Sequence, residues 1–83
     1  MKPVSDEQLR ILRAAHEGRL VSNEHGRWVI TGEAQRPERR ERQRLHGRGM
    51  IDYARTASDR EDYNQLVATA RGVAALAAAG STG

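Results

Sequence analysis

The 83-residue sequence contains no cysteine and no phenylalanine, only two prolines and a single tryptophan. Without cysteine, the chain can form neither a disulfide nor a thiolate zinc site. It also lacks any apolar run close to the ~20 residues of a membrane-spanning helix, and its N-terminus lacks the apolar centre of a signal peptide. We therefore expect a cytoplasmic protein that does not bind membranes.

Large apolar side chains are also scarce, since aromatic residues make up 4% of the chain. A chain of this size buries only ~60–65% of the surface that its unfolded form exposes. We expect one small domain over residues 1–83, with flexible tails at 1–4 and 80–83. So thin a core makes a homodimer plausible, because pairing would bury surface that one copy cannot cover.

Patterns typical of catalysis or metal binding are missing as well. None of the three histidines, His16, His25 and His46, has an acidic residue at ligand spacing. There is no glycine-rich phosphate loop and no nucleophile beside a base. We expect no enzyme activity, no metal and no cofactor, and we expect His16 to pack beside the apolar stripe of a helix.

Helical spacing and turn residues predict an α+β fold. Ser5 and Gln8 have the spacing of a capping box, which predicts a helix from Asp6 to about Glu17. Residues 19–22 and 27–30 are short apolar runs separated by an Asn- and Gly-containing turn, as in a β-hairpin.

The second half of the chain is expected to form a helix, a hairpin and a last helix. Pro37 is suited to open a helix over residues 36–48, which Gly47 and Gly49 end. A second hairpin follows, with strands at 50–55 and 63–68 around a polar loop at 57–62. Thr69 is a candidate cap for a last, alanine-rich helix over 70–79, in which we expect a packing reason for Gly72.

The predicted helix over residues 36–48 concentrates the positive charge. It holds six of the 14 basic residues and two of the 11 acidic ones, for a local charge of +4, whereas the remaining residues sum to −1. Such a stretch is either a phosphate-binding surface or a solvated helix stabilised by Glu38–Arg42 and Glu41–Arg44 pairs. The stretch alone favours neither interpretation.

The three aromatic residues have a simpler explanation. Trp28 could stack on a base, but a core with so few large residues favours a role in anchoring the first hairpin. Tyr53 and Tyr63 can face each other across the second hairpin, where packing is the expected role.

Two segments resemble a minimal winged helix-turn-helix domain. Leu45-His46-Gly47-Arg48-Gly49-Met50-Ile51 is similar to the end of that family's recognition helix and its entry into the wing, and Thr69-Ala70-Arg71-Gly72-Val73-Ala74-Ala75-Leu76 is similar to the T-x-x-G-x-x-x-L segment after the wing. The resemblance extends from Ser5 to Ala79, with the order helix, hairpin, helix, wing hairpin, helix. It departs from the family in one respect: the Trp28 hairpin stands where the family places a helix before the recognition helix.

The resemblance implies a small DNA-binding protein, such as a transcriptional regulator or an excisionase-like factor of bacteria or phages. Residues 36–48 would be the recognition helix, and the wing hairpin would contact phosphates. The implied nucleic-acid-binding residues are Arg36, Arg39, Arg40, Arg42, Gln43, Arg44, Arg48, Arg55 and Arg60. The alternative is a protein-interaction module whose arginines bind an acidic surface of a host protein. In either case the terminal alanine-rich helix could join two copies.

Overall fold

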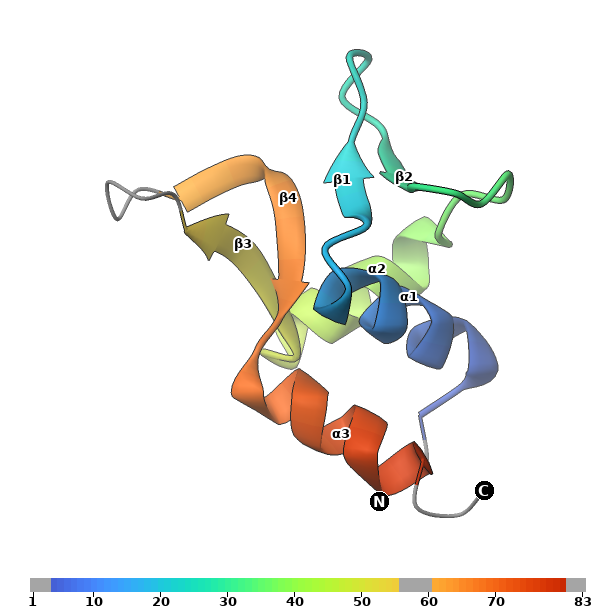
Figure 1. Ribbon diagram of the computed structural model, residues 1–83, viewed down its shortest axis with the longest axis vertical. Helices are drawn as coiled ribbons and strands as arrows, with labels where there is room; N and C mark the ends of the chain where they lie inside the picture. Colours follow the sequence, from blue (N-terminus) through green and yellow to red (C-terminus); the bar gives the residue numbers. More distant parts are fainter. Residues whose placement is uncertain (1–3, 56–60, 81–83) are drawn as a thin grey trace.

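The structure, a computed structural model, describes residues 4–55 and 61–80. It is a small α+β fold in which three helices pack on one four-stranded antiparallel sheet, with strand order β2-β1-β4-β3. The elements in chain order are α1 (Asp6–His16), β1 (Leu20–Ser22), β2 (Trp28–Ile30), α2 (Arg39–Gly47), β3 (Ile51–Arg55), β4 (Glu61–Ala68) and α3 (Ala70–Gly80). Figure 1 shows the two hairpins diverging from the three helices, β1 and β2 upward and β3 and β4 to the left.

The capping box predicted for α1 is confirmed. The backbone N–H of Gln8 donates to the Ser5 hydroxyl at 3.2 Å, and the Ser5 N–H donates to the Gln8 side chain at 3.2 Å. These two bonds satisfy amide groups that a helix start otherwise leaves unpaired. His16 ends the helix exposed, so the expectation that it packs against the core is wrong; its side chain lies beyond the buried stripe.

The first hairpin forms at the predicted turn. The Asn23 side-chain oxygen accepts hydrogen bonds from the N–H groups of His25 and Arg27, at 2.9 and 3.0 Å, and Gly26 adopts a φ of 75°. A positive φ is costly for residues with a Cβ, so glycine suits this position. Val21 of β1 also pairs with Gln65 of β4, and this pairing joins the two hairpins into one sheet.

The second hairpin is longer and more irregular than expected. Glu61 and Asp62, predicted to lie in the loop, belong to β4 because their backbones pair with Arg55 and Ala54. The pairing register shifts between Tyr53 and Ala54. The predicted aromatic contact across the hairpin is present, with the rings of Tyr53 and Tyr63 edge to face at 4.9 Å between centroids. The predicted tip of this hairpin lies outside the described residues.

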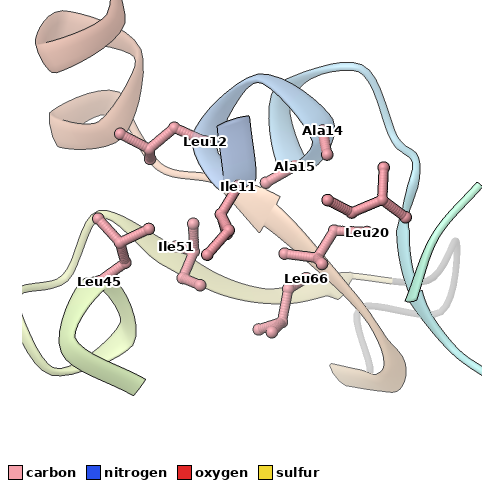
Figure 2. Packing of buried hydrophobic residues seen from close by; sticks show 9 residues of the cluster. Ile11, Leu12, Ala14, Ala15, Leu20, Leu45, Ile51 and Leu66 are labelled. Carbon is pink, nitrogen blue, oxygen red and sulfur yellow. The ribbon is translucent and has the colours of Figure 1, made fainter. Parts of the chain in front are cut away.

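One apolar cluster holds the elements together. Figure 2 shows side chains from α1, β1, α2, β3 and β4 meeting between the helices and the sheet. The fully buried large side chains are Ile11, Leu12, Leu20, Ile30, Leu45, Ile51 and Leu66. Trp28 packs at the edge of this cluster, as predicted from the scarcity of large residues, and Val4, expected in a flexible tail, also packs against it.

The last helix is fixed by a close approach that only glycine permits. Thr69 caps α3, since its hydroxyl accepts from the Gly72 N–H at 3.2 Å and donates to the Gly49 carbonyl at 2.6 Å. A Cβ on Gly72 would overlap the Met50 carbonyl oxygen and would lie 3.2 Å from Cδ2 of Leu12. The expected packing reason for Gly72 is therefore confirmed.

Candidate functional site

Helix α2 is held to the core along one side only. Leu45 is its single buried residue, and the helical repeat of 3.6 residues turns the opposite half toward solvent. The exposed polar side chains of α2 are Arg39, Arg40, Gln43 and Arg44, continued by Arg48 at the C-cap. These five residues form one continuous exposed strip, which we call the α2 ridge.

The two acidic residues of this region lie off the ridge. Glu41 turns toward the body of the protein, where it accepts a 2.7 Å hydrogen bond from the Gln8 amide; its side chain is 15% exposed, against 57% for Arg44. Arg44 keeps a long contact with it, at 3.5 Å. Among the described residues, this is the only ion pair of a ridge arginine.

The predicted Glu38–Arg42 ion pair is absent; the Arg42 guanidinium lies against the Trp28 ring instead, and Glu38 is not part of the helix. Its backbone is extended, with φ −66° and ψ 124°, and it forms the N-cap of α2. The helix accordingly begins at Arg39 and ends at Gly47, so its predicted limits of 36 and 48 are each too wide. Arg36 is exposed in the segment before the helix, and the neighbouring Pro37 is buried.

Arg42, expected among the nucleic-acid-binding residues, lies on the flank of α2 rather than on the ridge. Its guanidinium carbon stands 5.5 Å from the centroid of the Trp28 ring, within the range of a cation–π contact. Burial lowers the pKa of Arg42, while the neighbouring Tyr53 raises it. Arg42 is thus a partly desolvated cation beside an aromatic ring.

The first turns of α1 set the position of α2. The Glu7 carboxylate accepts two hydrogen bonds from Arg10, at 2.9 and 2.8 Å, and a third from the backbone N–H of Glu38 at 2.8 Å. Arg10 also donates to Glu33 and to the carbonyl oxygens of Gln35 and Arg36, at 2.9 to 3.1 Å. The connector that enters α2 is therefore tied to α1 at several points. The hydrogen bond from Arg10 lowers the pKa of Glu7.

A row of rings supports the inner flank of the same helix. His46 of α2 packs edge to face against Tyr53 at 5.2 Å, and Tyr53 lies 6.5 Å from Trp28. These contacts join α2 to β2 and β3, so that both hairpins fix how the ridge is presented.

The sequence did not reveal that Glu7, Gln8 and Arg10 of α1 position α2. Gln8 was expected only to cap α1, and the spacing of Glu7 and Arg10, three residues apart, was the one local sign of their ion pair. Their contacts with residues 33–41 depend on the tertiary fold. Of the two wing arginines, Arg55 lies exposed on β3, and Arg60 lies outside the described residues.

A cleft separates the tip of the first hairpin from the start of α2. Its lining includes four arginines, Arg27, Arg36, Arg39 and Arg42, together with Trp28, and contains no carboxylate. A second depression, lined by Asp6, Arg10, Arg13, Glu17, Arg19 and Glu33 among others, mixes both charges. Of these two depressions, the one beside α2 is lined by charged residues of one sign and the other is not.

Within residues 4–55 and 61–80, no three His, Asp or Glu side chains come together in a way that could hold a metal ion. In the same part of the chain, no helix combines the length and hydrophobicity needed to cross a bilayer. Comparisons with models of protein families, with curated proteins and with solved structures gave no match to this chain.

Proposed function

We propose that the protein binds double-stranded DNA through the α2 ridge. The observation that carries the proposal is the segregation of charge on this helix. Arg39, Arg40 and Arg44 share the solvent side, whereas Glu41 is withdrawn to Gln8. Arginines presented together, with little competition from neighbouring carboxylates, favour contact with a polyanion.

In this proposal α2 takes the part of the recognition helix in a winged-helix arrangement, and the β3–β4 hairpin is the wing. In winged-helix proteins, a helix at the position of β2 supports the recognition helix. Here the hydrogen bonds of Glu7 and Arg10 with the segment before α2 would take over that role. Arg55 on β3 would contact a phosphate beside the groove. The protein would act as a transcriptional regulator or an excisionase-like factor.

The ridge offers both kinds of contact that DNA recognition requires. Arginines that neutralise phosphates release counterions and so provide affinity that depends on salt. Arg39 or Arg40 can donate two hydrogen bonds to guanine and Gln43 can pair with adenine, each worth ~1–3 kcal/mol against the wrong base. Nine residues give α2 a length of about 13 Å, enough to enter the major groove over only a few base pairs.

A dimer would contact more base pairs than the short α2 helix of one copy can reach. Small apolar residues are exposed on the outer side of α3, among them Ala70, Ala74 and Ala77. Val73 lies with them and is 38% exposed. Arg71, the charged residue of this helix, instead donates a 2.9 Å hydrogen bond to the Arg48 carbonyl. Pairing of α3 with its copy would place two α2 ridges on one DNA molecule. Paired half-sites are the usual way in which small DNA-binding domains gain specificity.

Fluorescence anisotropy of a labelled duplex over a salt series tests the proposal. If the four arginines of the ridge each neutralise one phosphate, the logarithm of the binding constant falls with the logarithm of salt concentration at a slope of about −3 to −4. Arg40→Ala reduces the slope by about 0.9. Arg13→Ala is the matched control, because Arg13 is an exposed arginine of α1 away from the ridge and its loss changes the net charge equally.

If no duplex binds at low salt, or if the binding constant does not change with salt concentration, DNA is not the ligand. In that case the alternative, an acidic surface of a host protein, becomes the better proposal. It predicts a stoichiometric protein partner in nuclease-treated lysate that is lost when Arg40 and Arg44 are both changed to Glu.

A further inference from the structure

The cleft between the first hairpin and α2 is lined by Arg42, a partly buried cation. No carboxylate of the described residues pairs with it. Arg42 is half-buried, and among the described residues it has no ion-pair partner. Its contact with the Trp28 ring at 5.5 Å compensates only part of the lost hydration. Burial accordingly lowers its pKa. Such a group gains more from an incoming anion than a fully hydrated arginine does.

Three more arginines line the same space, each from a separate segment. Arg27 comes from the hairpin turn, Arg36 from the connector and Arg39 from the first turn of α2. Arginines tied to carboxylates lie elsewhere: Arg10 binds Glu7 and Glu33, and Arg19 binds Glu17 and Glu33. The described fold thus leaves the cleft arginines available to an external anion.

The backbone around the cleft is held in place. Asn23 fixes the turn that carries Arg27, and Arg10 binds the carbonyl oxygen of Arg36 at 3.0 Å. Pro37, which lines the cleft, is buried. The backbone N–H of Glu38, the N-cap of α2, is also held, since it donates to the Glu7 carboxylate at 2.8 Å.

We propose that this cleft binds a phosphate of the DNA backbone, as a second contact beside the α2 ridge. The inference rests on the proposed function and adds the β1–β2 hairpin to the interface. Arg39 belongs to both the cleft and the ridge, so one surface continues from the hairpin tip to α2. A phosphate matches the cleft because arginine donates to its oxygens in a bidentate manner. The hairpin that replaces a helix of the winged-helix pattern then has a binding role of its own.

Trp28 allows the cleft to be observed directly, because it is the only tryptophan of the chain. The experiment titrates the full-length protein with a duplex and records both anisotropy of the labelled DNA and Trp28 emission. We expect the emission to change as the duplex saturates the protein. We expect Arg27→Ala and Arg36→Ala each to weaken duplex binding. We expect the double variant to reduce the salt slope by about 0.9, the contribution of one phosphate, without altering preference among duplex sequences.

Two controls separate the cleft from the ridge. Arg40→Ala weakens binding but keeps the full emission change at saturation, because Arg40 does not line the cleft. Arg13→Ala leaves both readouts unchanged. Circular dichroism of each variant confirms that it is folded; exposed Arg27 and Arg36 make no side-chain hydrogen bond or ion pair within the described part of the chain.

Each other result overturns the inference in a distinguishable way. If the wild type binds duplex with the expected salt slope, but Arg27→Ala and Arg36→Ala behave as Arg13→Ala and Trp28 emission does not respond, the cleft is not part of the interface and the proposed function stands. If no duplex binds at low salt, both proposals fail. If inorganic phosphate saturates the Trp28 response at concentrations where duplex gives none, the cleft binds a small phosphate and not DNA.

Discussion

Replacing Gly72 by alanine should destabilise the protein, although helix propensity alone predicts the opposite. Alanine is favoured over glycine within a helix by ~1 kcal/mol. At Gly72, however, the new methyl group would overlap the carbonyl oxygen of Met50. That oxygen cannot withdraw freely, because it accepts a 3.0 Å hydrogen bond from the Thr69 N–H. On the other side, Leu12 Cδ2 of the core lies 3.2 Å from the methyl position.

The balance of these effects sets the expected magnitude. Overpacking of this kind costs ~1–3 kcal/mol or more, and a backbone obstacle places Gly72→Ala at the upper end of that range. After subtraction of the gain in propensity, we expect a net loss of about 2 kcal/mol in the free energy of unfolding. In a domain of this size, that loss lowers the Tm by ~8–16 °C.

Urea and thermal unfolding followed by circular dichroism measure this difference, and Gly47→Ala provides a matched control. Gly47 also lies in a helix, but a Cβ added there would meet no atom within 4 Å beyond its chain neighbours and the backbone of its own helix. We expect Gly47→Ala to be neutral or to stabilise by up to about 1 kcal/mol. Equal or higher stability of Gly72→Ala relative to the wild type would refute the packing of α3 against the turn after α2.

Three further predictions concern the contacts of α1 and α3. Because Arg10 lowers the pKa of Glu7, the ionised carboxylate stabilises the fold above its unfolded pKa of ~4.3, and this stabilisation is lost as the pH falls through the folded value. The difference in unfolding free energy between wild type and Glu7→Gln, measured with urea, should therefore be largest at neutral pH and shrink in acid; a constant difference down to pH ~3 would contradict this reasoning. Gln8→Ala removes one of the two capping-box bonds, the one from the Ser5 N–H, together with the bond to Glu41. It should cost ~1–2 kcal/mol in urea unfolding, whereas Gln43→Ala on the exposed ridge should cost less than ~0.5 kcal/mol. Sedimentation equilibrium should show a dimer that Ala74→Glu converts to a monomer; a wild-type monomer at high concentration would rule out pairing through α3.

Local structure was predictable where neighbouring residues determine it. The capping box of α1, the Asn23–Gly26 turn and the cap at Thr69 each depend on residues within four positions of one another. Their interactions are therefore visible in the sequence. The limits of α2 were predicted less well, because a proline suited to a first helical turn lies here in the segment just before it.

The arrangement around the candidate site depends on residues far apart in the chain. Gln8 meets Glu41 across 33 positions and Glu7 meets the Glu38 backbone across 31. The spacing of apolar and polar residues along the sequence does not indicate contacts between residues this far apart. The arginine-rich stretch could be recognised from its composition, but its division between the α2 ridge and the cleft could not, because Arg42 turns toward a tryptophan of another element.

The most direct test of the account is NMR observation of the arginine side-chain Nε–H resonances during titration with a DNA duplex. The account predicts that the resonances of Arg39, Arg40, Arg44 and Arg48 shift together, while those of Arg10 and Arg19, bound to carboxylates in the fold, stay unchanged. Shifts confined to arginines outside α2, or no shift at low salt, would contradict the claim that this helix presents its cations to DNA.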